Sequence, residues 1–383
     1  MPSGSMQGGV SDARLDPGLL EPVFAGLEQH VQAGHLSGAA LAVGDADGAI
    51  RSQAFALHTR TRVESEALFF LASLTKPIFA TALMQLVEDE VLDLHAPLAR
   101  YLPEFVATGG EADQDKELVT PWHLLTHTSG VPDTPPDIIG RERPSAARMT
   151  EMAMRAPLRF VPGTRWEYCS ASYYLLGELI PRLVGMSYQQ FLQERLFEPL
   201  AMSTTFDPRR KGLPIVPVQG VGADSRLRRW LLLRYVVSIA QPGGGLFGTL
   251  EDLLRFGAAL LRPRDGRKAG RQGAASLPLR PETIALLGED QTQGVPGLIE
   301  GEERPVRFGL GWNKPTLMHS LPGSAQVIGH GGATGTSLWI DPPAQLVFVY
   351  FTNQWAPDRS PELEALRGVY EVLRRAGRSV QAG

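Results

Sequence analysis

Strand-forming patterns stand at the two ends of this 383-residue chain, and helical patterns fill the stretch between them. Near the N-terminus, residues 37–57 place two small, apolar segments on either side of Asp47-Gly48, a dipeptide typical of β-hairpin turns. Near the C-terminus, four further segments are strand-like: 307–313, 326–332, 336–342 and 346–354. The economical arrangement is one sheet built from both ends of the chain, with the helical middle inserted as a second domain.

Helical spacing of apolar residues is clearest in six segments: 16–35, 77–92, 172–185, 188–200, 250–261 and 362–377. We therefore predict an α+β fold, in which an antiparallel sheet flanked by helices forms a discontinuous domain from residues 1–65 and 300–383. Residues 66–299 form the second, mainly helical domain. Residues 1–15 are rich in Gly and Ser, and we expect them to be mobile. A cleft between the two domains is the natural place for an active site.

The charge and cysteine content exclude several classes of protein. The formal net charge is -4 and basic residues form no long stripe, so we expect no nucleic-acid partner. Cys169 is the only cysteine and cannot form a disulfide within the chain. The longest apolar run, residues 230–240, is short and contains Arg234, so we expect no membrane span and no membrane partner. The N-terminal segment lacks the basic and apolar regions of a secretory signal, and we expect a cytoplasmic location.

The segment Ser73-Leu74-Thr75-Lys76 is an S-x-x-K motif that leads into a helical pattern. Residues i and i+3 share one face of a helix, so the Lys76 amine can reach the Ser73 hydroxyl. A serine becomes a good nucleophile when a base takes its proton, and lysine can be that base when burial or a nearby cation lowers its pKa below about 10.4. At the helix start, the backbone N–H of Ser73 can also stabilise an oxyanion. The motif alone is weak, because about one chain in four of this composition contains it by chance.

Tyr168, Cys169 and Ser170 directly precede another helical pattern, on a segment that can face a cleft. Tyr168 is a candidate for passing protons between Ser73 and a leaving group, and Ser170 for a hydrogen bond to Lys76 or to substrate. The alternative is a capping serine beside a packed tyrosine. Cys169 itself is more simply read as a packed side chain than as a catalytic one.

His330, Gly331 and Gly332 lie in a strand-like segment near the C-terminus, and Ala333 follows them. Two glycines in a strand indicate that something approaches the backbone closely, and a ligand laid along the strand is one candidate. The backbone N–H of Ala333 is then a second candidate donor to an oxyanion. A β-bulge or a tight turn beside a packed histidine is the alternative.

Together and in this order, the three motifs resemble those of the serine β-lactamase-like, penicillin-recognising hydrolases. That family includes class C β-lactamases, D-alanyl-D-alanine carboxypeptidases and β-lactamase-like esterases. The resemblance implies the β-lactamase/transpeptidase-like fold. It extends over about residues 16–375 and includes these further segments: 73–105, 120–132, 162–180, 242–261, 307–313 and 328–342.

The resemblance also implies a role for each matching residue. Ser73 would be the acylated nucleophile, and Lys76 and Tyr168 would be the coupled acid–base pair. The backbone N–H groups of Ser73 and Ala333 would form the oxyanion hole. Which of Lys76 and Tyr168 takes the serine proton stays open, since closely coupled groups titrate as a pair. Backbone donors stabilise the oxyanion in this mechanism, so we expect no metal and no organic cofactor.

The sequence departs from the family's pattern at positions that would bind substrate. His330-Gly331-Gly332 stands where β-lactamases have Lys-Thr-Gly, so a substrate carboxylate would meet neither a lysine nor a hydroxyl there. Ser170 stands where many relatives have asparagine. We therefore predict a serine hydrolase that forms an acyl-enzyme on a small ester or amide, and a carboxylesterase is our first hypothesis.

Two alternatives stay open beside the carboxylesterase. A β-lactamase or D-alanyl-D-alanine carboxypeptidase would use the same mechanism. A non-catalytic ligand-binding or sensor protein would use the same scaffold without the chemistry. The sequence leaves the oligomeric state open as well.

Three other features have simpler interpretations. Gly243-x-Gly245-x-x-Gly248 matches a dinucleotide fingerprint, but it lacks a strand–helix–strand context and fits the family's Gly-Gly loop beside the cleft better. His123 and His127 have the i, i+4 spacing of a metal-binding pair, but no third ligand is apparent in the sequence. We expect both to be structural and His127 to brace a loop. Residues 226–240 do not match the family well; a lid, a dimer contact and ordinary core are all open, and we favour core or a substrate wall.

Overall fold

The computed structural model describes nine stretches of the chain: 14–56, 64, 66–106, 111–134, 140–220, 225–262, 277–299, 301–314 and 322–378. The expectation of a mobile N-terminus concerns residues 1–15, of which residues 1–13 lie outside these stretches. Leu15 is buried, and the Arg14 guanidinium lies 3.3 Å from the Asp45 carboxylate. The described chain is therefore attached to the sheet from its first residues onward.

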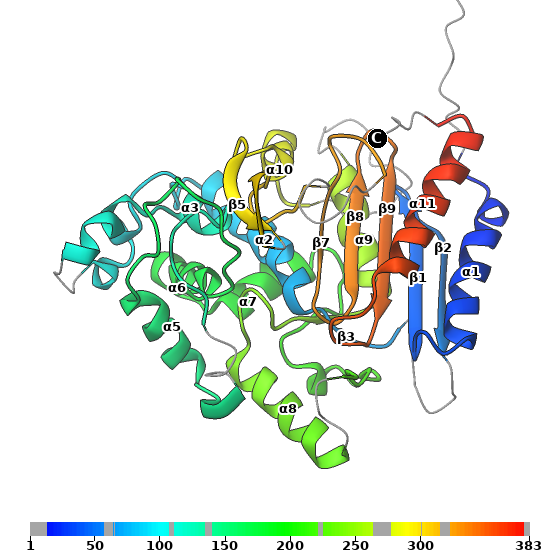
Figure 1. Ribbon diagram of the computed structural model, residues 1–383, viewed down its shortest axis with the longest axis horizontal. Helices are drawn as coiled ribbons and strands as arrows, with labels where there is room; N and C mark the ends of the chain where they lie inside the picture. Colours follow the sequence, from blue (N-terminus) through cyan, green and yellow to red (C-terminus); the bar gives the residue numbers. More distant parts are fainter. Residues whose placement is uncertain are drawn as a thin grey trace, which may run out of the picture.

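A five-stranded antiparallel sheet combines the two ends of the chain, in the order β2-β1-β9-β8-β7 (Figure 1). Its N-terminal strands, β1 (Gly38–Asp45) and β2 (Gly48–Ala56), form the hairpin predicted at Asp47-Gly48. Its C-terminal strands are β7 (Ile328–Gly331), β8 (Thr336–Asp341) and β9 (Leu346–Thr352), and β9 pairs with β1. The predicted α+β class, with one antiparallel sheet from both ends, is confirmed.

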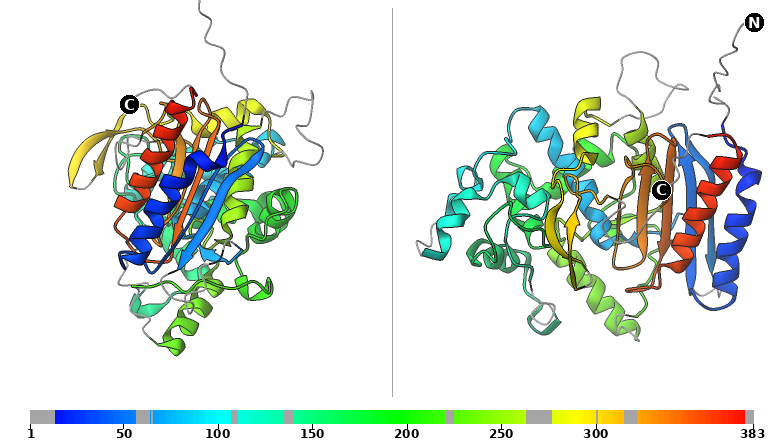
Figure 2. Two further views of the ribbon diagram at one scale, coloured as in Figure 1. Left: turned by 90° about the vertical axis from the view of Figure 1, so that its right-hand side faces the viewer. Right: turned by 45° about the horizontal axis from the view of Figure 1, so that its top comes forward.

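Helices cover both faces of this sheet, because alternate residues of each strand point to opposite sides. On one face, α1 (Glu21–Gln32) and α11 (Ser360–Arg375) pack side by side, as Figure 2 shows. The β1 residues on that face are Ala39, Leu41 and Val43. On the other face, α9 (Leu250–Leu261) packs against β1 and β9, and the β1 residues Ala40 and Ala42 belong to the larger core.

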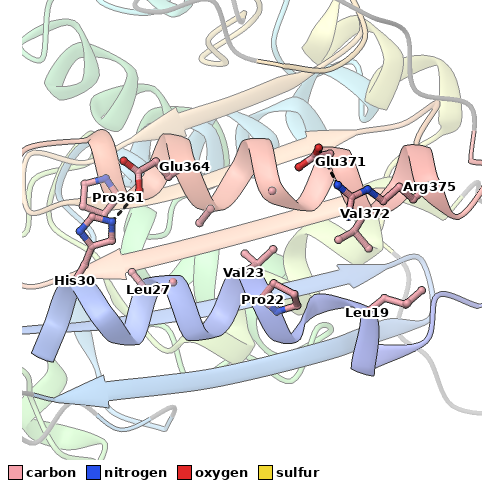
Figure 3. Close-up of a pocket in the computed structure, with 13 residues that line it drawn as sticks. Leu19, Pro22, Val23, Leu27, His30, Pro361, Glu364, Glu371, Val372 and Arg375 are labelled. Carbon is pink, nitrogen blue, oxygen red and sulfur yellow. Dashed lines mark hydrogen bonds and ion pairs between the residues drawn. The ribbon is translucent and has the colours of Figure 1, made fainter.

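A shallow groove runs between α1 and α11 on the outer side of the sheet (Figure 3). The His30 ring and the Glu364 carboxylate lie 2.8 Å apart across it, and Arg375 donates to Glu371 at 3.1 Å. Its walls are made by side chains of α1, the turn before it and α11, and none of the three sequence motifs contributes to them. The groove is therefore separate from the candidate catalytic residues.

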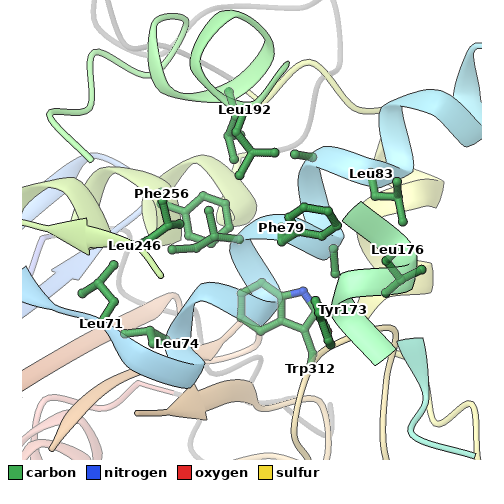
Figure 4. Packing of buried hydrophobic residues seen from close by; sticks show 14 of the residues in the cluster. Leu71, Leu74, Phe79, Leu83, Tyr173, Leu176, Leu192, Leu246, Phe256 and Trp312 are labelled. Carbon is green, nitrogen blue, oxygen red and sulfur yellow. The ribbon is translucent and has the colours of Figure 1, made fainter. Parts of the chain in front are cut away.

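The helical part surrounds α2 (Thr75–Glu88), in which every residue from Thr75 to Leu86 is buried. Figure 4 shows its Phe79 among aromatic and aliphatic side chains, including Tyr173 and Trp312. The other α-helices described there are α3 (Pro121–Leu125), α5 (Ala146–Arg155), α6 (Ser172–Val184), α7 (Tyr188–Leu192), α8 (Arg226–Ile239) and α10 (Pro281–Gly288), and a π-helical turn, Gln193–Phe197, follows α7. A central, fully buried helix can hold polar groups in fixed positions.

Short elements connect these helices and strands. The 3-10 helices described are Pro17–Leu20, Ala72–Leu74, Leu98–Arg100, Pro103–Phe105, Glu111–Leu118 and Pro208–Arg210. The two-residue strands β3 (Phe69–Phe70) and β4 (Phe247–Gly248) pair just before the Ser73 turn. Their pairing brings the glycine-rich segment 243–245 near the start of α2.

Two sequence expectations differ from the structure in the last third of the chain. Residues 307–313 make only isolated bridges at Phe308 and Asn313 instead of a strand. Gly311 has φ +74°, and a Cβ there would lie 2.6 Å from Ala80, so the chain turns at this close approach to α2. A hairpin that the sequence analysis did not identify, β5 (Val295–Ile299) with β6 (Glu302–Val306), spans the predicted domain boundary at 299/300.

The prediction that residues 226–240 form core is wrong for helix α8. None of its 14 residues is buried. Its sequence resembles a core helix because it is rich in Leu and Val, but four arginines interrupt every face.

Candidate active site

Ser73 lies in the tight turn between β3 and α2. Ala72 adopts φ +47°, a left-handed conformation that non-glycine residues rarely take and that clusters at functional sites. Ala72 to Leu74 form a short 3-10 turn that continues directly into α2 at Thr75. The α-helix therefore begins slightly later than Ser73, where the sequence analysis placed its start. Leu74 and Lys76 are buried, whereas Ser73 is half-buried and remains accessible.

The Lys76 ammonium is held by three acceptors from three parts of the chain. Its Nζ donates to Ser73 Oγ at 3.3 Å, to Ser170 Oγ at 3.1 Å and to the Gly243 carbonyl oxygen at 2.9 Å. A lysine ammonium has three donors, so all of them are used. The residue is 1% exposed, and it therefore has a single well-defined position beside the serine.

Tyr168 contacts Lys76 through its ring. The Lys76 Nζ lies 4.8 Å from the centroid of the Tyr168 ring and 5.3 Å from that of Tyr173, within the range of cation–π attraction. Among the residues that the structure describes, no direct hydrogen bond joins the Tyr168 hydroxyl to Ser73 or Lys76. Lys76 therefore contacts both Ser73 and Tyr168, and the proton-transfer role of Tyr168 stays a prediction.

His127 supports the segment that carries Tyr168. Its ring lies 4.6 Å from the Tyr168 ring, and its Nδ1 accepts a hydrogen bond from the Cys169 backbone N–H at 3.2 Å. Burial, with the nearby positive charge of Lys76, holds the pKa of His127 well below its ordinary value. His127 is therefore neutral, with its proton on Nε2, and it acts as the brace that the sequence analysis expected.

His330 is a buried, neutral histidine at the end of β7. Its Nδ1 donates to the Gly331 carbonyl oxygen at 2.7 Å, and its Nε2 has no hydrogen-bond partner among the described residues. Burial, followed by the positive charge of Lys76, lowers the pKa of His330 to about 3. At neutral pH this position therefore carries no positive charge.

The close approach at Gly332 is made by the protein's own backbone. A Cβ at Gly332 would lie 2.2 Å from the Leu71 carbonyl oxygen and 2.4 Å from Thr336 Oγ1. Thr336 Oγ1 donates to that same carbonyl at 3.0 Å. Gly332 is therefore required for the strand end to pack against the segment before Ser73, and this contact, rather than a ligand, explains why a glycine stands there.

Contacts on both sides of Ala333 hold it near the segment that precedes Ser73. The next residue, Thr334, donates through Oγ1 to the Phe70 carbonyl oxygen at 2.5 Å. The Ala333 backbone N–H has no hydrogen-bond partner within the described stretches. The N–H of Ser73 lies in the first turn of its helix, where such groups lack partners inside the helix. Both N–H groups are thus candidates for binding an oxyanion, as the sequence analysis proposed.

Cys169 is a packed residue, although it lies within the second motif. Burial, with the nearby Asp133 carboxylate, raises the pKa of its thiol to about 12. The Ser172 N–H donates to its Sγ at 3.4 Å, and the Ala171 N–H donates to Asp133 at 3.0 Å. These bonds hold the turn that carries Ser170 and leave Cys169 protonated and unreactive.

Across the described stretches, no group of three or more His, Cys, Asp or Glu side chains is arranged to hold a metal ion. Each helix in that part of the chain is too short or too polar to cross a bilayer.

A sequence model of the Beta-lactamase family matches residues 24–370, which is most of the chain. The chain belongs to the Beta-lactamase family. This member of the family is a serine hydrolase. Esterase EstB from Burkholderia gladioli is 28% identical over 328 residues, 76% of this chain and 78% of the esterase. A putative D-alanyl-D-alanine carboxypeptidase from Escherichia coli K12 is 26% identical over 319 residues, 75% of this chain and 69% of the relative.

Solved structures share the fold at lower sequence identity. A penicillin-binding protein homologue from Caulobacter crescentus superposes with a TM-score of 0.75 at 19% identity, over 94% of this family member and 99% of the homologue. EstCE1, a hydrolase with promiscuous acyltransferase activity, gives a TM-score of 0.69 at 20% identity, over 92% and 99% of the two chains. The β-lactamase/transpeptidase-like fold is thereby confirmed.

Sequence reasoning missed one contact of the site in this Beta-lactamase family member. The Gly243 carbonyl is the nearest acceptor of Lys76, yet the sequence analysis placed its loop only beside the cleft. A Cβ at Gly243 would lie 2.7 Å from Tyr173, so the glycine lets this loop reach the centre of the site. The run Gly243-Gly244-Gly245 was the sequence signal for such a close approach of the backbone.

Proposed function

We propose that this chain is a carboxylesterase that hydrolyses small, uncharged carboxylic esters through an acyl-enzyme on Ser73. The observation that carries the proposal is the uncharged end of strand β7. His330 is buried and neutral, and Gly331 has no hydroxyl to offer a substrate carboxylate. A substrate without a carboxylate loses nothing at this position, whereas a β-lactam or a peptide ending in D-alanine loses its anchor.

The guanidinium nearest to this strand end is already paired. Arg359 Nη1 lies 3.3 Å from the position that a Cβ at Gly331 would occupy. Arg359 forms two hydrogen bonds with the Glu362 carboxylate, at 2.9 and 2.7 Å. Glu362 is 2% exposed, so releasing Arg359 to bind a substrate anion would leave a buried, unpaired carboxylate. This arrangement supports a neutral substrate.

Acylation uses the groups around Ser73. Ser73 Oγ attacks the carbonyl carbon of the ester, and its proton passes to the Lys76–Tyr168 pair. The carbonyl oxygen becomes an oxyanion that accepts hydrogen bonds from the backbone N–H groups of Ser73 and Ala333. The bond to the alcohol oxygen then breaks, and the pair returns a proton to the leaving alkoxide. Ser73 is left as an ester of the substrate's acid.

Deacylation reverses these proton movements with water in place of the alcohol. Water attacks the acyl carbonyl and gives its proton to the same pair. The oxyanion re-forms in the same hole, the bond to Ser73 Oγ breaks, and the pair returns the proton to the serine. Ser170 Oγ and the Gly243 carbonyl keep the Lys76 amine in place throughout.

The names of the relatives support both the proposal and its rival. EstB is named as an esterase and EstCE1 as a hydrolase with promiscuous acyltransferase activity, whereas the relatives from Escherichia coli and Salmonella are named as putative D-alanyl-D-alanine carboxypeptidases. The mechanism is common to both activities, so the substrate distinguishes them. A cytoplasmic location stays a prediction from the sequence.

A substrate comparison tests the proposal. We expect turnover of p-nitrophenyl acetate and butyrate with a kcat/KM at least about 100-fold above that for nitrocefin, and no release of D-alanine from a D-alanyl-D-alanine peptide. Ser73→Ala should abolish ester turnover. Faster turnover of nitrocefin or of the peptide would favour a β-lactamase or a carboxypeptidase. Absence of all three activities, with no covalent adduct, would favour a binding or sensor protein.

A further inference from the structure

Helix α8 (Arg226–Ile239) is an exposed helix with an apolar sequence. Nine of its 14 residues are aliphatic or aromatic, yet none is buried. Figure 1 and both views of Figure 2 place α8 at the periphery of the molecule. A solvent-facing helix of this composition is unusual in a chain that folds around its own core, and it is typical of an interaction surface.

Three of the four exposed large apolar side chains of α8 lie on one side of the helix, and the fourth, Leu232, is 37% exposed on another side. Leu227, Trp230 and Leu231 are 64%, 50% and 38% exposed, and their i, i+3, i+4 spacing places them on one helix face. Arg234 continues the same face, and its guanidinium lies 4.7 Å from the Trp230 ring centroid. The face thus combines apolar side chains, an aromatic ring and a cation.

The charge around this face is positive and local. Residues 225–250 contain four arginines and no Asp, Glu or Lys, in a chain whose formal net charge is -4. The arginines are Arg226, Arg228, Arg229 and Arg234. A partner that matches this face must therefore offer an apolar layer next to negative charge. Anionic lipid headgroups above acyl chains have that chemistry, and Trp, Leu and Arg are the residues that interfacial helices use.

We propose that α8 docks this protein on an anionic lipid surface. Leu227, Trp230 and Leu231 would enter the headgroup region, and Arg226 and Arg234 would bind phosphate groups at its level. The sequence-based expectation of no membrane partner rested on the lack of a spanning segment, and surface docking requires none. The proposal is independent of the ester chemistry at Ser73.

A second copy of the chain is the less suitable occupant. Pairing two α8 helices through this face would bring Arg226 and Arg234 of one copy close to the same residues of the other, and α8 itself has no carboxylate. The helix is also attached at defined points: Tyr235 Oη donates to the Pro144 carbonyl at 3.2 Å, and Tyr188 Oη donates to the Ala240 carbonyl at 2.7 Å. These contacts leave the Leu227 face directed outward.

Vesicle binding tests the proposal with the full chain. The protein is sedimented with vesicles of phosphatidylcholine alone and of phosphatidylcholine with phosphatidylglycerol, at low and high salt. One variant removes the apolar face, Leu227→Ser with Trp230→Ser and Leu231→Ser, and another removes charge, Arg226→Gln with Arg234→Gln. A matched control, Leu19→Ser with Arg375→Gln, removes an exposed leucine and an exposed arginine from the α1 and α11 region. Circular dichroism and turnover of a water-soluble ester confirm that each variant is folded.

We expect binding to the anionic vesicles at least about tenfold tighter than to neutral ones, and weaker binding at high salt. Each α8 variant should lose about tenfold or more of this affinity, while the control binds as the wild type does. Failure of the wild type to bind anionic vesicles, or equal binding by the α8 variants, overturns the proposal. It is also overturned if sedimentation velocity shows a dimer that the apolar variant dissociates while no vesicle binding is seen, since that result assigns the face to a second copy.

Discussion

The Lys76 ammonium and the Gly243 carbonyl oxygen lie 2.9 Å apart, although 167 residues separate them along the chain. This hydrogen bond, together with the one to Ser170, fixes the amine beside Ser73. A lysine so held cannot move away from the nucleophile when substrate enters. The proposed chemistry therefore depends on acceptors that do not themselves react.

Removing one of these acceptors should reduce turnover without unfolding the protein. Ser170→Ala leaves Lys76 with two acceptors, and hydrogen bonds to charged groups are worth about 1.5–3 kcal/mol. We expect kcat/KM for p-nitrophenyl butyrate to fall about 10- to 100-fold. Ser172→Ala is the matched control, because Ser172 Oγ is buried without a partner among the described residues. Its ester turnover should not change, and equal losses in the two variants would contradict the role of Ser170.

Gly332→Ala should destabilise the fold strongly. The added Cβ would lie 2.2 Å from the Leu71 carbonyl oxygen, which is backbone and cannot rotate away. We expect a loss of about 3 kcal/mol in the free energy of unfolding, measured by urea denaturation. Gly26→Ala provides the comparison: it lies within α1, a Cβ there has no neighbour within 4 Å, and we expect about 0.5–1 kcal/mol of stabilisation. An unchanged free energy of unfolding in Gly332→Ala would show that the end of strand β7 does not pack against Leu71 in this way.

The buried neutral state of His330 should make stability depend on pH. Its pKa is about 3 in the folded protein and about 6.5 in the unfolded chain, so the unfolded chain binds the proton more readily. Its contribution is fully present above about pH 6.5 and is lost progressively as the pH falls toward 3. Between pH 7 and pH 5 the loss should be about 2 kcal/mol.

The measurement is urea unfolding of the wild type and of His330→Asn at both pH values. The asparagine variant should show a smaller fall in unfolding free energy from pH 7 to pH 5, by about the same 2 kcal/mol. The same substitution at His35, which is exposed, gives the baseline change. Parallel behaviour of the wild type and His330→Asn would mean that His330 is not held neutral by burial.

Local rules predicted much of this structure and site. The hairpin at Asp47-Gly48 and the proximity of Ser73 and Lys76 follow from turn chemistry and helix spacing over a few residues. The combination of both ends of the chain in one sheet followed from the strand patterns at those ends, whereas the order of the strands was not predicted. These features depend on neighbours in the sequence or on burial of one face.

Other features depend on tertiary contacts that spacing does not encode. Gly243 reaches Lys76 only because a loop passes Tyr173 closely, and Gly332 is needed because Leu71 lies against it. Helix α8 was expected in the core, since periodicity alone does not distinguish a buried apolar helix from an exposed one. The turn at Gly311 likewise replaced a strand because α2 lies next to it.

In the proposed mechanism, Ser73 becomes covalently acylated with the help of Lys76. Intact-protein mass spectrometry after reaction with a fluorophosphonate probe, followed by peptide mapping, tests it directly. We expect one adduct, located on Ser73, in the wild type, none in Ser73→Ala, and a rate of labelling reduced by at least about 100-fold in Lys76→Ala. An adduct on another residue, or labelling of Lys76→Ala at the wild-type rate, would contradict the account.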